Sequence, residues 1–301
     1  MGVSDGILVI NKPLGITSHD VVAKVRKTLG IRKVGHAGTL DPEASGVLVL
    51  GVNRGTRLMQ YFVGDNKRYE AKIRLGVATI SDDAAGEVIS VTPNSLTVEQ
   101  ITVELNNFVG SIMQRPSSVS AIKVNGTRAH DLVRAGVELV LPERPVTVHQ
   151  IELTGINGVT YSEKPITEIS VKVHCSSGTY VRALARDLGA ALKVGGSVLS
   201  LKRTQAGVFN LADAIELADL TIDAKLLSPG DVAKRIMNVQ VINSAHILDL
   251  AHGRSILLPT PDTNPLALLD EAGNLISIGE LSNGIFQPVN VFVTPVELLD
   301  V

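Results

Sequence analysis

One segment of the chain carries residue types that could do chemistry, the loop of residues 35–46 with the sequence GHAGTLDPEASG. Its glycines and its proline indicate a stiff, tightly turned loop, in which the backbone can approach a ligand closely. Asp41 lies within this loop, and Arg32, Lys33 and His36 lie just before that carboxylate. The cationic residues could bind phosphate or stack on a base while Asp41 acts as a nucleophile or a base. The alternative is that the Asp-Pro pair only begins a turn.

The sequence does not support the more familiar kinds of catalytic site. It contains no GxxxxGK[ST] motif and no GxGxxG after a predicted strand, so a nucleotide-phosphate loop is not indicated. The seven histidines show no close metal-ligand spacing, and the single Cys175 excludes a disulfide framework and a cysteine-rich zinc site. The Ser-Asp-Asp run at 81–83 lacks the alternating ligands of a calcium loop and predicts a plain turn. We therefore expect neither a metal nor a cofactor.

Strands and helices that could position the loop alternate along the chain without a regular βαβ rhythm, which favours an α+β fold. A helix is expected to begin with Ser18 as its N-cap and to end at Gly30, and it has a basic outer side. Uninterrupted apolar runs or strict alternation predict strands at Ile7–Ile10, Val47–Val52, Tyr69–Leu75 and Glu168–Cys175.

A second helix is expected over Tyr180–Leu188, with Val181, Leu184, Ala185 and Leu188 buried. Arg182 and Arg186 then lie one turn apart on the opposite side. From the spacing alone, this pair is typical of a solvated helix face, and neither arginine is favoured over the other as a site residue.

The net charge of −2 conceals an uneven distribution. Residues 1–75 hold 12 Lys/Arg and 6 Asp/Glu, residues 76–210 hold 12 of each, and residues 211–301 hold 4 and 12. A basic N-terminal part can attract a polyanion even when the whole chain is acidic. The alternative is chance variation between domains.

Length and composition predict a folded chain of about two domains of roughly 150 residues each. Hydrophobic residues make up 45% of the sequence, which is enough for a sizeable core. We place the boundary at 225/226, which gives a domain over 1–225 and a small β-rich domain over 226–301. Residues 123–145 are rich in Arg, Glu and Gly and predict an exposed, mobile insertion.

The N-terminus does not look like a signal peptide, and no apolar run approaches the ~18 residues of a membrane span. We therefore expect a cytoplasmic protein.

Six blocks in the same order as in a known family show a specific resemblance over residues 7–210. The chain resembles the bacterial TruB-type tRNA pseudouridine-55 synthases in the blocks INKPLGITSHDVV (9–22), GHAGTLDPEASGVLVLG (35–51), KRYEAKIRLG (67–76), SAIKVNG (120–126), CSSGTYVRALARDLG (175–189) and LKRTQAGVF (201–209). The resemblance implies a pseudouridine synthase fold, in which helices flank a mixed, largely antiparallel central sheet. It also implies a small C-terminal RNA-binding domain of PUA type.

The resemblance also implies a role for individual residues. Asp41 takes the position of the catalytic aspartate, and Arg182 that of the arginine that pairs with it. Tyr69 takes the position of the tyrosine that stacks on the target base and assists proton removal from C5. The residues implied to bind the substrate or the RNA are His36, Tyr69, Tyr180, Leu201 and Lys12, and Lys12 together with Pro13 is also expected to support the catalytic loop.

The activity implied is isomerisation of uridine 55 to pseudouridine in the T-loop of tRNA, with the base flipped out of the stack. The reaction consumes no redox equivalent, no ATP and no metal, which agrees with the missing cofactor motifs. The expected partner is the tRNA T-arm, with no membrane and no small-molecule cofactor, and the protein is expected to be a monomer. Two alternatives are a tRNA-folding chaperone and a related synthase acting on another RNA. The insertion at 123–145 is a candidate clamp that becomes ordered on tRNA.

Overall fold

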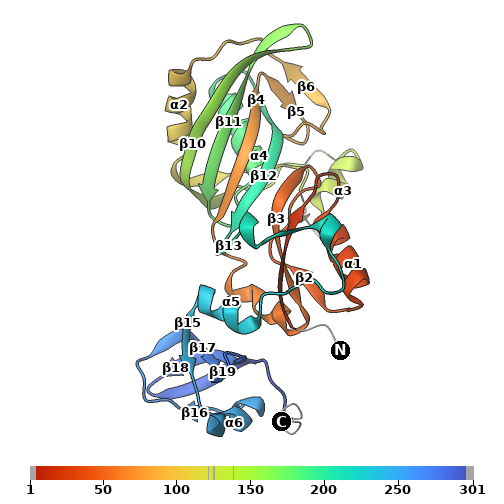
Figure 1. The fold of residues 1–301 in the computed structure, drawn as a ribbon. Helices are drawn as coiled ribbons and strands as arrows, with labels where there is room; N and C mark the ends of the chain where they lie inside the picture. Colours follow the sequence, from red (N-terminus) through yellow and green to blue (C-terminus); the bar gives the residue numbers. More distant parts are fainter. Residues whose placement is uncertain (1–4, 121, 125, 138, 296–301) are drawn as a thin grey trace.

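A large mixed sheet forms the body of the protein (Figure 1). The computed structural model describes residues 5–120, 122–124, 126–137 and 139–295. In this part of the chain the main sheet has ten strands in the order β14-β1-β3-β12-β4-β11-β10-β7, with β2 paired to β3 and β13 to β12. The strands are β1 (Gly6–Lys12), β2 (Val34–His36), β3 (Ala44–Val52), β4 (Lys67–Leu75), β7 (Gly110–Gln114), β10 (Arg144–Tyr161), β11 (Lys164–Cys175), β12 (Gly196–Ala206), β13 (Phe209–Asn210) and β14 (Ile215–Glu216).

Most neighbouring strands of this sheet run antiparallel. The two parallel pairs are β1 with β14 and β3 with β12. The prediction of a mixed, largely antiparallel sheet is therefore confirmed. Two small hairpins lie outside it, and they consist of β5 (Val77–Thr79) with β6 (Val88–Val91) and β8 (Lys123–Val124) with β9 (Thr127–Arg128).

Helices cover the sheet and connect its strands (Figure 1). The α-helices are α1 (Ser18–Leu29), α2 (Val98–Asn107), α3 (Ala129–Arg134), α4 (Val181–Ala191), α5 (Pro229–Ile236) and α6 (Ile247–Ala251). Short 3-10 turns lie at η1 (Asn53–Arg57), η2 (Met59–Tyr61), η3 (Leu211–Asp213), η4 (Leu217–Asp219) and η5 (Ser244–His246). The apolar sides of α2 and α4 share one core with β4, β10, β11 and β12.

The first helix begins one residue earlier than the sequence suggested. Thr17, not Ser18, is the N-cap of α1, and it forms a reciprocal capping box with Asp20. The Ser18 side chain is buried instead, and its hydroxyl bonds the backbone of Leu40. The end at Gly30 is as expected, since Gly30 adopts the left-handed conformation (φ 67°).

Strands β1 and β3 are buried on both faces, which explains their uninterrupted apolar runs. On one face, Leu8 of β1 and Leu48 of β3 pack with the buried side of α1. On the other face, Val9 and Val49 pack with residues of the C-terminal part, such as Ala267. The central strands that flank the loop of residues 35–46 are therefore held from both sides.

The C-terminal part is β-rich, as expected. Its five strands follow the order β15-β17-β18-β19-β16, with β15 (Asn238–Val241), β16 (Ile256–Leu257), β17 (Thr263–Leu269), β18 (Leu275–Ser282) and β19 (Ile285–Val291). The predicted boundary at 225/226 falls between η4 and α5. Whether the two parts are separate domains stays a prediction, because one apolar cluster contains residues of both sheets.

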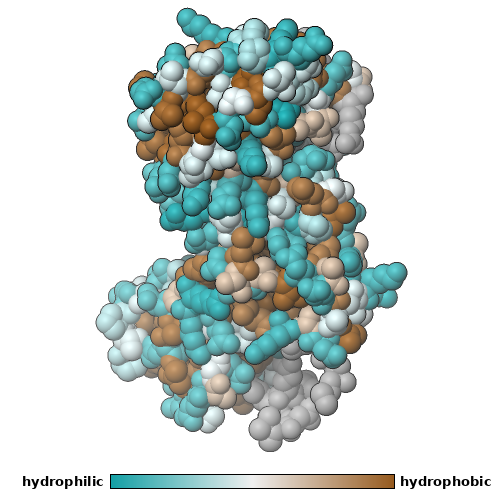
Figure 2. All heavy atoms as spheres, turned by 45° about the horizontal axis from the view of Figure 1, so that its top comes forward, coloured by the Kyte–Doolittle hydropathy of each residue, from teal (hydrophilic) through white to brown (hydrophobic). Residues whose placement is uncertain are grey.

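Large exposed apolar side chains concentrate between residues 80 and 140, and Ile89, Met113 and Val140 are among the most exposed. Figure 2 shows hydrophobic and hydrophilic residues interspersed on one face of the molecule, with a larger hydrophobic group at its upper end. Among the described residues, no helix is long and apolar enough to cross a membrane.

Candidate active site

Asp41 lies on the turn between β2 and β3, and neighbouring elements fix the backbone of this turn. The buried Ser18 hydroxyl accepts from the Leu40 amide at 2.9 Å and donates to the Leu40 carbonyl at 3.0 Å. The Lys12 ammonium donates to the Pro42 carbonyl at 3.4 Å. The Asp41 side chain itself remains 38% exposed. The loop therefore presents a carboxylate to solvent from a rigid base, as its sequence predicted.

Arg203 secures the same turn from β12. Its side chain is fully buried, and the guanidinium donates to the carbonyls of Gly38, Thr39 and Val47 at 3.0, 3.3 and 2.8 Å. Gly46 allows the close approach of β12 to β3, because a Cβ at its φ of 104° would collide with the Arg203 backbone. No local pattern distinguishes Arg203, since an Arg in a strand is usually exposed.

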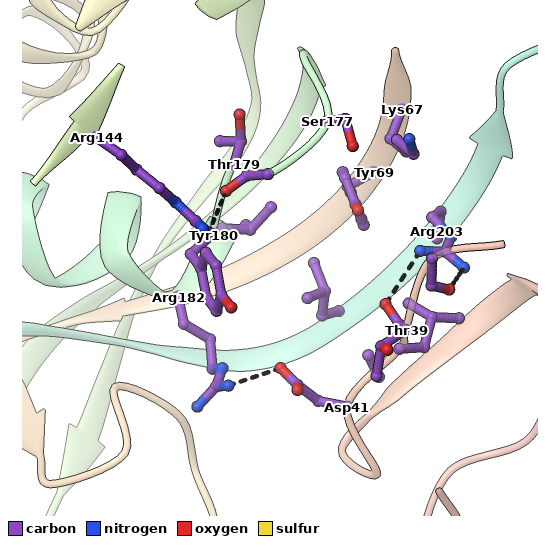
Figure 3. A pocket seen from close by; sticks show the side chains of 16 residues that line it. Thr39, Asp41, Lys67, Tyr69, Arg144, Ser177, Thr179, Tyr180, Arg182 and Arg203 are labelled. Carbon is purple, nitrogen blue, oxygen red and sulfur yellow. Dashed lines mark hydrogen bonds and ion pairs between the residues drawn. The ribbon is translucent and has the colours of Figure 1, made fainter. Parts of the chain in front are cut away.

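Arg182 faces Asp41 from the first turn of α4 (Figure 3). Its Nη2 lies 2.8 Å from Asp41 Oδ2 and donates to the Val119 carbonyl at 2.9 Å. Its Nη1 lies 3.2 Å from Asp83 Oδ2 and donates to the Ser81 carbonyl at 2.8 Å. The expectation that Arg182 lies on the solvated side of its helix is wrong. The side chain is buried, and two carboxylates and two carbonyls pair with its two Nη atoms, whereas its Nε has no hydrogen-bond partner among the described residues.

Arg186, one turn further along α4, keeps a partly exposed side chain and pairs with Asp82 and Asp187. The helix itself begins at Val181, with Tyr180 as its N-cap, and not at Tyr180. Burial of Val181 and Leu188 is confirmed.

Asp83 is a second residue of the site that the sequence alone did not indicate. The Ser-Asp-Asp run at 81–83 predicted only a turn, and it does form one. Within this turn the Asp83 carboxylate is buried, accepts from the Ser81 hydroxyl and the Ala85 amide, and contacts Arg182. No local pattern distinguishes it from Asp82, because the arginine it meets comes from a distant helix.

A cleft of about 220 Å³ lies in front of this ion pair. Its wall includes Asp41, Tyr69, Tyr180, Arg182 and Leu201, and so the structure brings together these five predicted site residues (Figure 3). The neighbouring strands explain the arrangement, since β12 lies between β3 and β4 in the sheet. A cleft with an apolar side chain, an aromatic ring and a charged pair suits a planar, polar base.

The surroundings of Tyr69 shift the pKa of its hydroxyl. Burial raises the pKa of Tyr69, and the charge of Arg203 opposes this shift. The hydroxyl is therefore protonated at neutral pH and can donate or exchange a proton at the cleft wall.

Two predicted RNA-binding residues, Lys12 and His36, are not among those that line this cleft. Lys12 is fully buried, and its ammonium also donates to the carbonyls of Pro13 and Ile16, at 2.8 and 2.7 Å. Burial lowers the pKa of Lys12 to about 8. This position fits the expected supporting role and leaves no surface for an RNA contact.

His36 packs edge-on against His19, with ring centroids 5.6 Å apart, and burial lowers the pKa of His36. Its contact with RNA stays a prediction.

The residues 123–145 form the β8–β9 hairpin, helix α3 and the start of β10 within their described part, and residues 125 and 138 lie outside it. Their mobility stays a prediction. Across the described part of the chain, no group of three or more His, Cys, Asp or Glu could hold a metal ion.

Comparisons with known proteins agree with this geometry. Residues 26–181 match the family model described as TruB family pseudouridylate synthase (N terminal domain), and residues 182–236 match tRNA pseudouridylate synthase B C-terminal domain. The chain is 45% identical to tRNA pseudouridine synthase B of Corynebacterium efficiens, over 91% of this chain and 95% of that protein. It is 40% identical to the protein of the same name from Thermobifida fusca, over 96% and 99%.

Two solved structures share the fold. A chain from an H/ACA RNP bound to a substrate RNA containing 2'-deoxyuridine superposes with a TM-score of 0.71 at 22% identity, over 96% of this chain and 86% of that one. A chain from a Cbf5-Nop10-Gar1 complex gives 0.69 at 23% identity, over 97% and 86%. The fold is that of the pseudouridine synthases. Within this class, the chain belongs to the TruB family, and the predicted resemblance is confirmed.

Proposed function

We propose that this protein isomerises uridine 55 in the T-loop of tRNA to pseudouridine. The observation that carries the proposal is the ion pair between Asp41 and Arg182, at 2.8 Å, on the wall of a cleft that also contains Tyr69 and Leu201. Relatives with 40–45% identity over most of their length carry the name tRNA pseudouridine synthase B, which supports tRNA as the substrate. The basic residues of the N-terminal part supply attraction for phosphates.

The reaction begins with extrusion of the uracil from the folded T-arm, at a cost of a few kcal/mol. Stacking of a base on an aromatic ring returns about 1–3 kcal/mol, and Tyr69 is placed at the cleft wall to provide it. Leu201 covers a further part of the same wall.

The chemical step breaks the N1–C1′ bond and joins C5 to C1′. C5 loses a proton and N1 carries one in the product, so atoms and electrons balance within the nucleotide and no redox cofactor is required. The Asp41 carboxylate attacks C6 or C1′, or stabilises a glycal formed by loss of the C2′ proton. Each route uses the negative charge of the carboxylate, and the Arg182 guanidinium holds that carboxylate in an ion pair of 2.8 Å. In this proposal Tyr69 takes part in the removal of the C5 proton.

The proposal also covers the oligomeric state, the location and the RNA-binding segments. The protein acts as a monomer in the cytoplasm, and the C-terminal β-rich part contributes to RNA binding as a PUA-like domain. Residues 123–145 clamp the T-arm.

The test is chemical mapping of pseudouridine after incubation with an unmodified tRNA transcript and with a T-arm minihelix. We expect modification at position 55 of both RNAs and none in a transcript with cytidine at that position. Refolding of tRNA without any pseudouridine would replace the proposal with the chaperone function. Modification of a different RNA alone would replace it with a synthase of another specificity.

A further inference from the structure

The segment between β7 and β10 leaves the sheet and returns to it at one point. Gln114 is the last residue of β7, Arg144 is the first residue of β10, and these two residues are direct partners in the sheet. The described part of residues 115–143, with the β8–β9 hairpin and α3, therefore begins and ends at this pair.

The Gln114 side chain is buried, with 1% of the residue exposed, and it forms hydrogen bonds with the start of α4. Its Oε1 accepts from the Tyr180 amide at 2.8 Å, and its Nε2 donates to the Tyr180 carbonyl at 3.1 Å. Tyr180 is the N-cap of α4, and its own side chain does not cap the helix. The amide of Gln114 thus fixes both backbone polar groups of the residue from which α4 begins.

Arg144 holds the ring of the same tyrosine. Its guanidinium carbon lies 5.0 Å from the centroid of the Tyr180 ring, and its Nη2 donates to the Gly178 carbonyl at 2.8 Å. Figure 3 shows Arg144 and Tyr180 together on one side of the cleft. Gln114 and Arg144 therefore both contact Tyr180, which precedes Arg182 by about half a turn of helix.

We propose that Gln114 is a positioning residue for the isomerisation, which acts through Tyr180 and Arg182 and does not touch the substrate. This inference rests on the proposed function. A change in the Gln114–Tyr180 contact moves the first turn of α4, and with it the guanidinium that faces Asp41. A displacement of about 1 Å in a reacting group can cost about a hundredfold in rate. The segment that follows Gln114 also contacts this guanidinium directly, since the Val119 carbonyl accepts from Arg182 Nη2.

The experiment compares Gln114→Met, which keeps the length of the side chain and removes both hydrogen bonds, with Gln114→Asn, which keeps the amide and shortens its reach. The matched control is Asn94→Leu. The Asn94 amide also donates to backbone carbonyls, those of Leu75 and Thr92, but it lies at the end of β4 away from Tyr69. For each full-length variant, the thermal midpoint, the dissociation constant for tRNA and the single-turnover rate of pseudouridine formation are measured.

We expect both Gln114 variants to lower the single-turnover rate by about tenfold or more, with the dissociation constant for tRNA within about threefold of the parent. Asn94→Leu should keep the parent rate even where its thermal midpoint falls equally. The inference is overturned if the Gln114 variants, tested where they are folded, keep the parent rate or lose no more rate than Asn94→Leu. A parent protein that makes no pseudouridine would instead overturn the proposed function.

Discussion

At the scale of residues, the guanidinium of Arg182 joins two carboxylates that come from different loops. Asp41 could be predicted from its own segment, because a glycine-rich turn that presents a single carboxylate is a local pattern. Arg182 could not be separated from Arg186 without the family resemblance, and Asp83 was missed altogether. The structure separates the two arginines by burial, since Arg182 is 5% exposed. Tertiary contacts determine which arginine and which carboxylates pair in the site, and the residue spacing within one helix does not reveal these contacts.

Replacement of Arg182 by lysine tests this shared contact. A lysine carries one compact charge and cannot bridge two carboxylates as the planar guanidinium does. We expect Arg182→Lys to lower the single-turnover rate by about a hundredfold. Arg186→Lys, one turn further along α4, should change the rate by no more than about threefold, because Arg186 contacts Asp82, Asp187 and the Arg115 carbonyl and not Asp41. Equal losses in the two variants would contradict a specific role for Arg182.

Tyr69 makes two separable contributions, a ring surface and a hydroxyl. Tyr69→Phe keeps the ring and removes the hydroxyl, whereas Tyr69→Leu removes both. We expect both variants to lose turnover, with tRNA affinity within about threefold, and Tyr69→Leu also to weaken base capture in a fluorescence assay of flipping. Normal turnover in Tyr69→Phe would rule out the hydroxyl as a participant in proton transfer.

At the scale of elements, the strands were predictable where their apolar pattern is continuous. The runs of β1 and β3 are buried on both faces, and the alternation of β4 and β11 matches one buried and one exposed face. The start of α1 was displaced by one residue because Ser18 bonds Leu40 and not its own helix. A contact between the helix and a loop more than 20 residues away leaves no trace in local propensity.

Lys12 at the end of β1 makes the free energy of unfolding depend on pH. Burial lowers its pKa from 10.5 to about 8, so between these values the unfolded chain holds more of this proton than the folded one. The free energy of unfolding therefore gains from Lys12 as the pH rises from 8 to 10.5, by at most about 1.4 kcal/mol for each pKa unit.

The measurement is urea unfolding of the parent and of Lys12→Met across this range. Contributions from other titrating groups cancel in the difference between the two proteins. We expect the difference in free energy of unfolding to shift in favour of the parent as the pH rises above 8. A difference that stays constant would show that Lys12 is not desolvated in solution.

At the scale of the whole molecule, the C-terminal part shares its core with the strands beside the active site. Phe292 is 4% exposed and belongs to the same cluster as Val9 and Val49. Arg54 and Arg57 donate to the carbonyls of Phe292 and Val291, and Asn290 donates to the Tyr61 hydroxyl at 2.8 Å. The sequence pattern and the family resemblance predicted a small β-rich domain here, but nothing in the local sequence indicated that it would support β1 and β3.

Truncation of Phe292 tests whether the two parts unfold together. We expect Phe292→Ala to lower the free energy of unfolding by about 3–5 kcal/mol and to leave one cooperative transition, monitored by far-ultraviolet circular dichroism and by loss of activity. Phe286→Ala, in the separate core on the other face of the second sheet, is the control for a purely local loss. Two transitions in the parent, with activity following only one of them, would contradict a shared core.

We propose that the Asp41 carboxylate, held beside Arg182, carries out the isomerisation. The most direct measurement is the single-turnover rate of pseudouridine formation in an unmodified tRNA transcript by Asp41→Asn, together with its dissociation constant for that tRNA. The substitution keeps the shape of the side chain and removes its charge. We predict no detectable pseudouridine while tRNA still binds within about threefold of the parent. Turnover near the parent rate in Asp41→Asn would contradict the account.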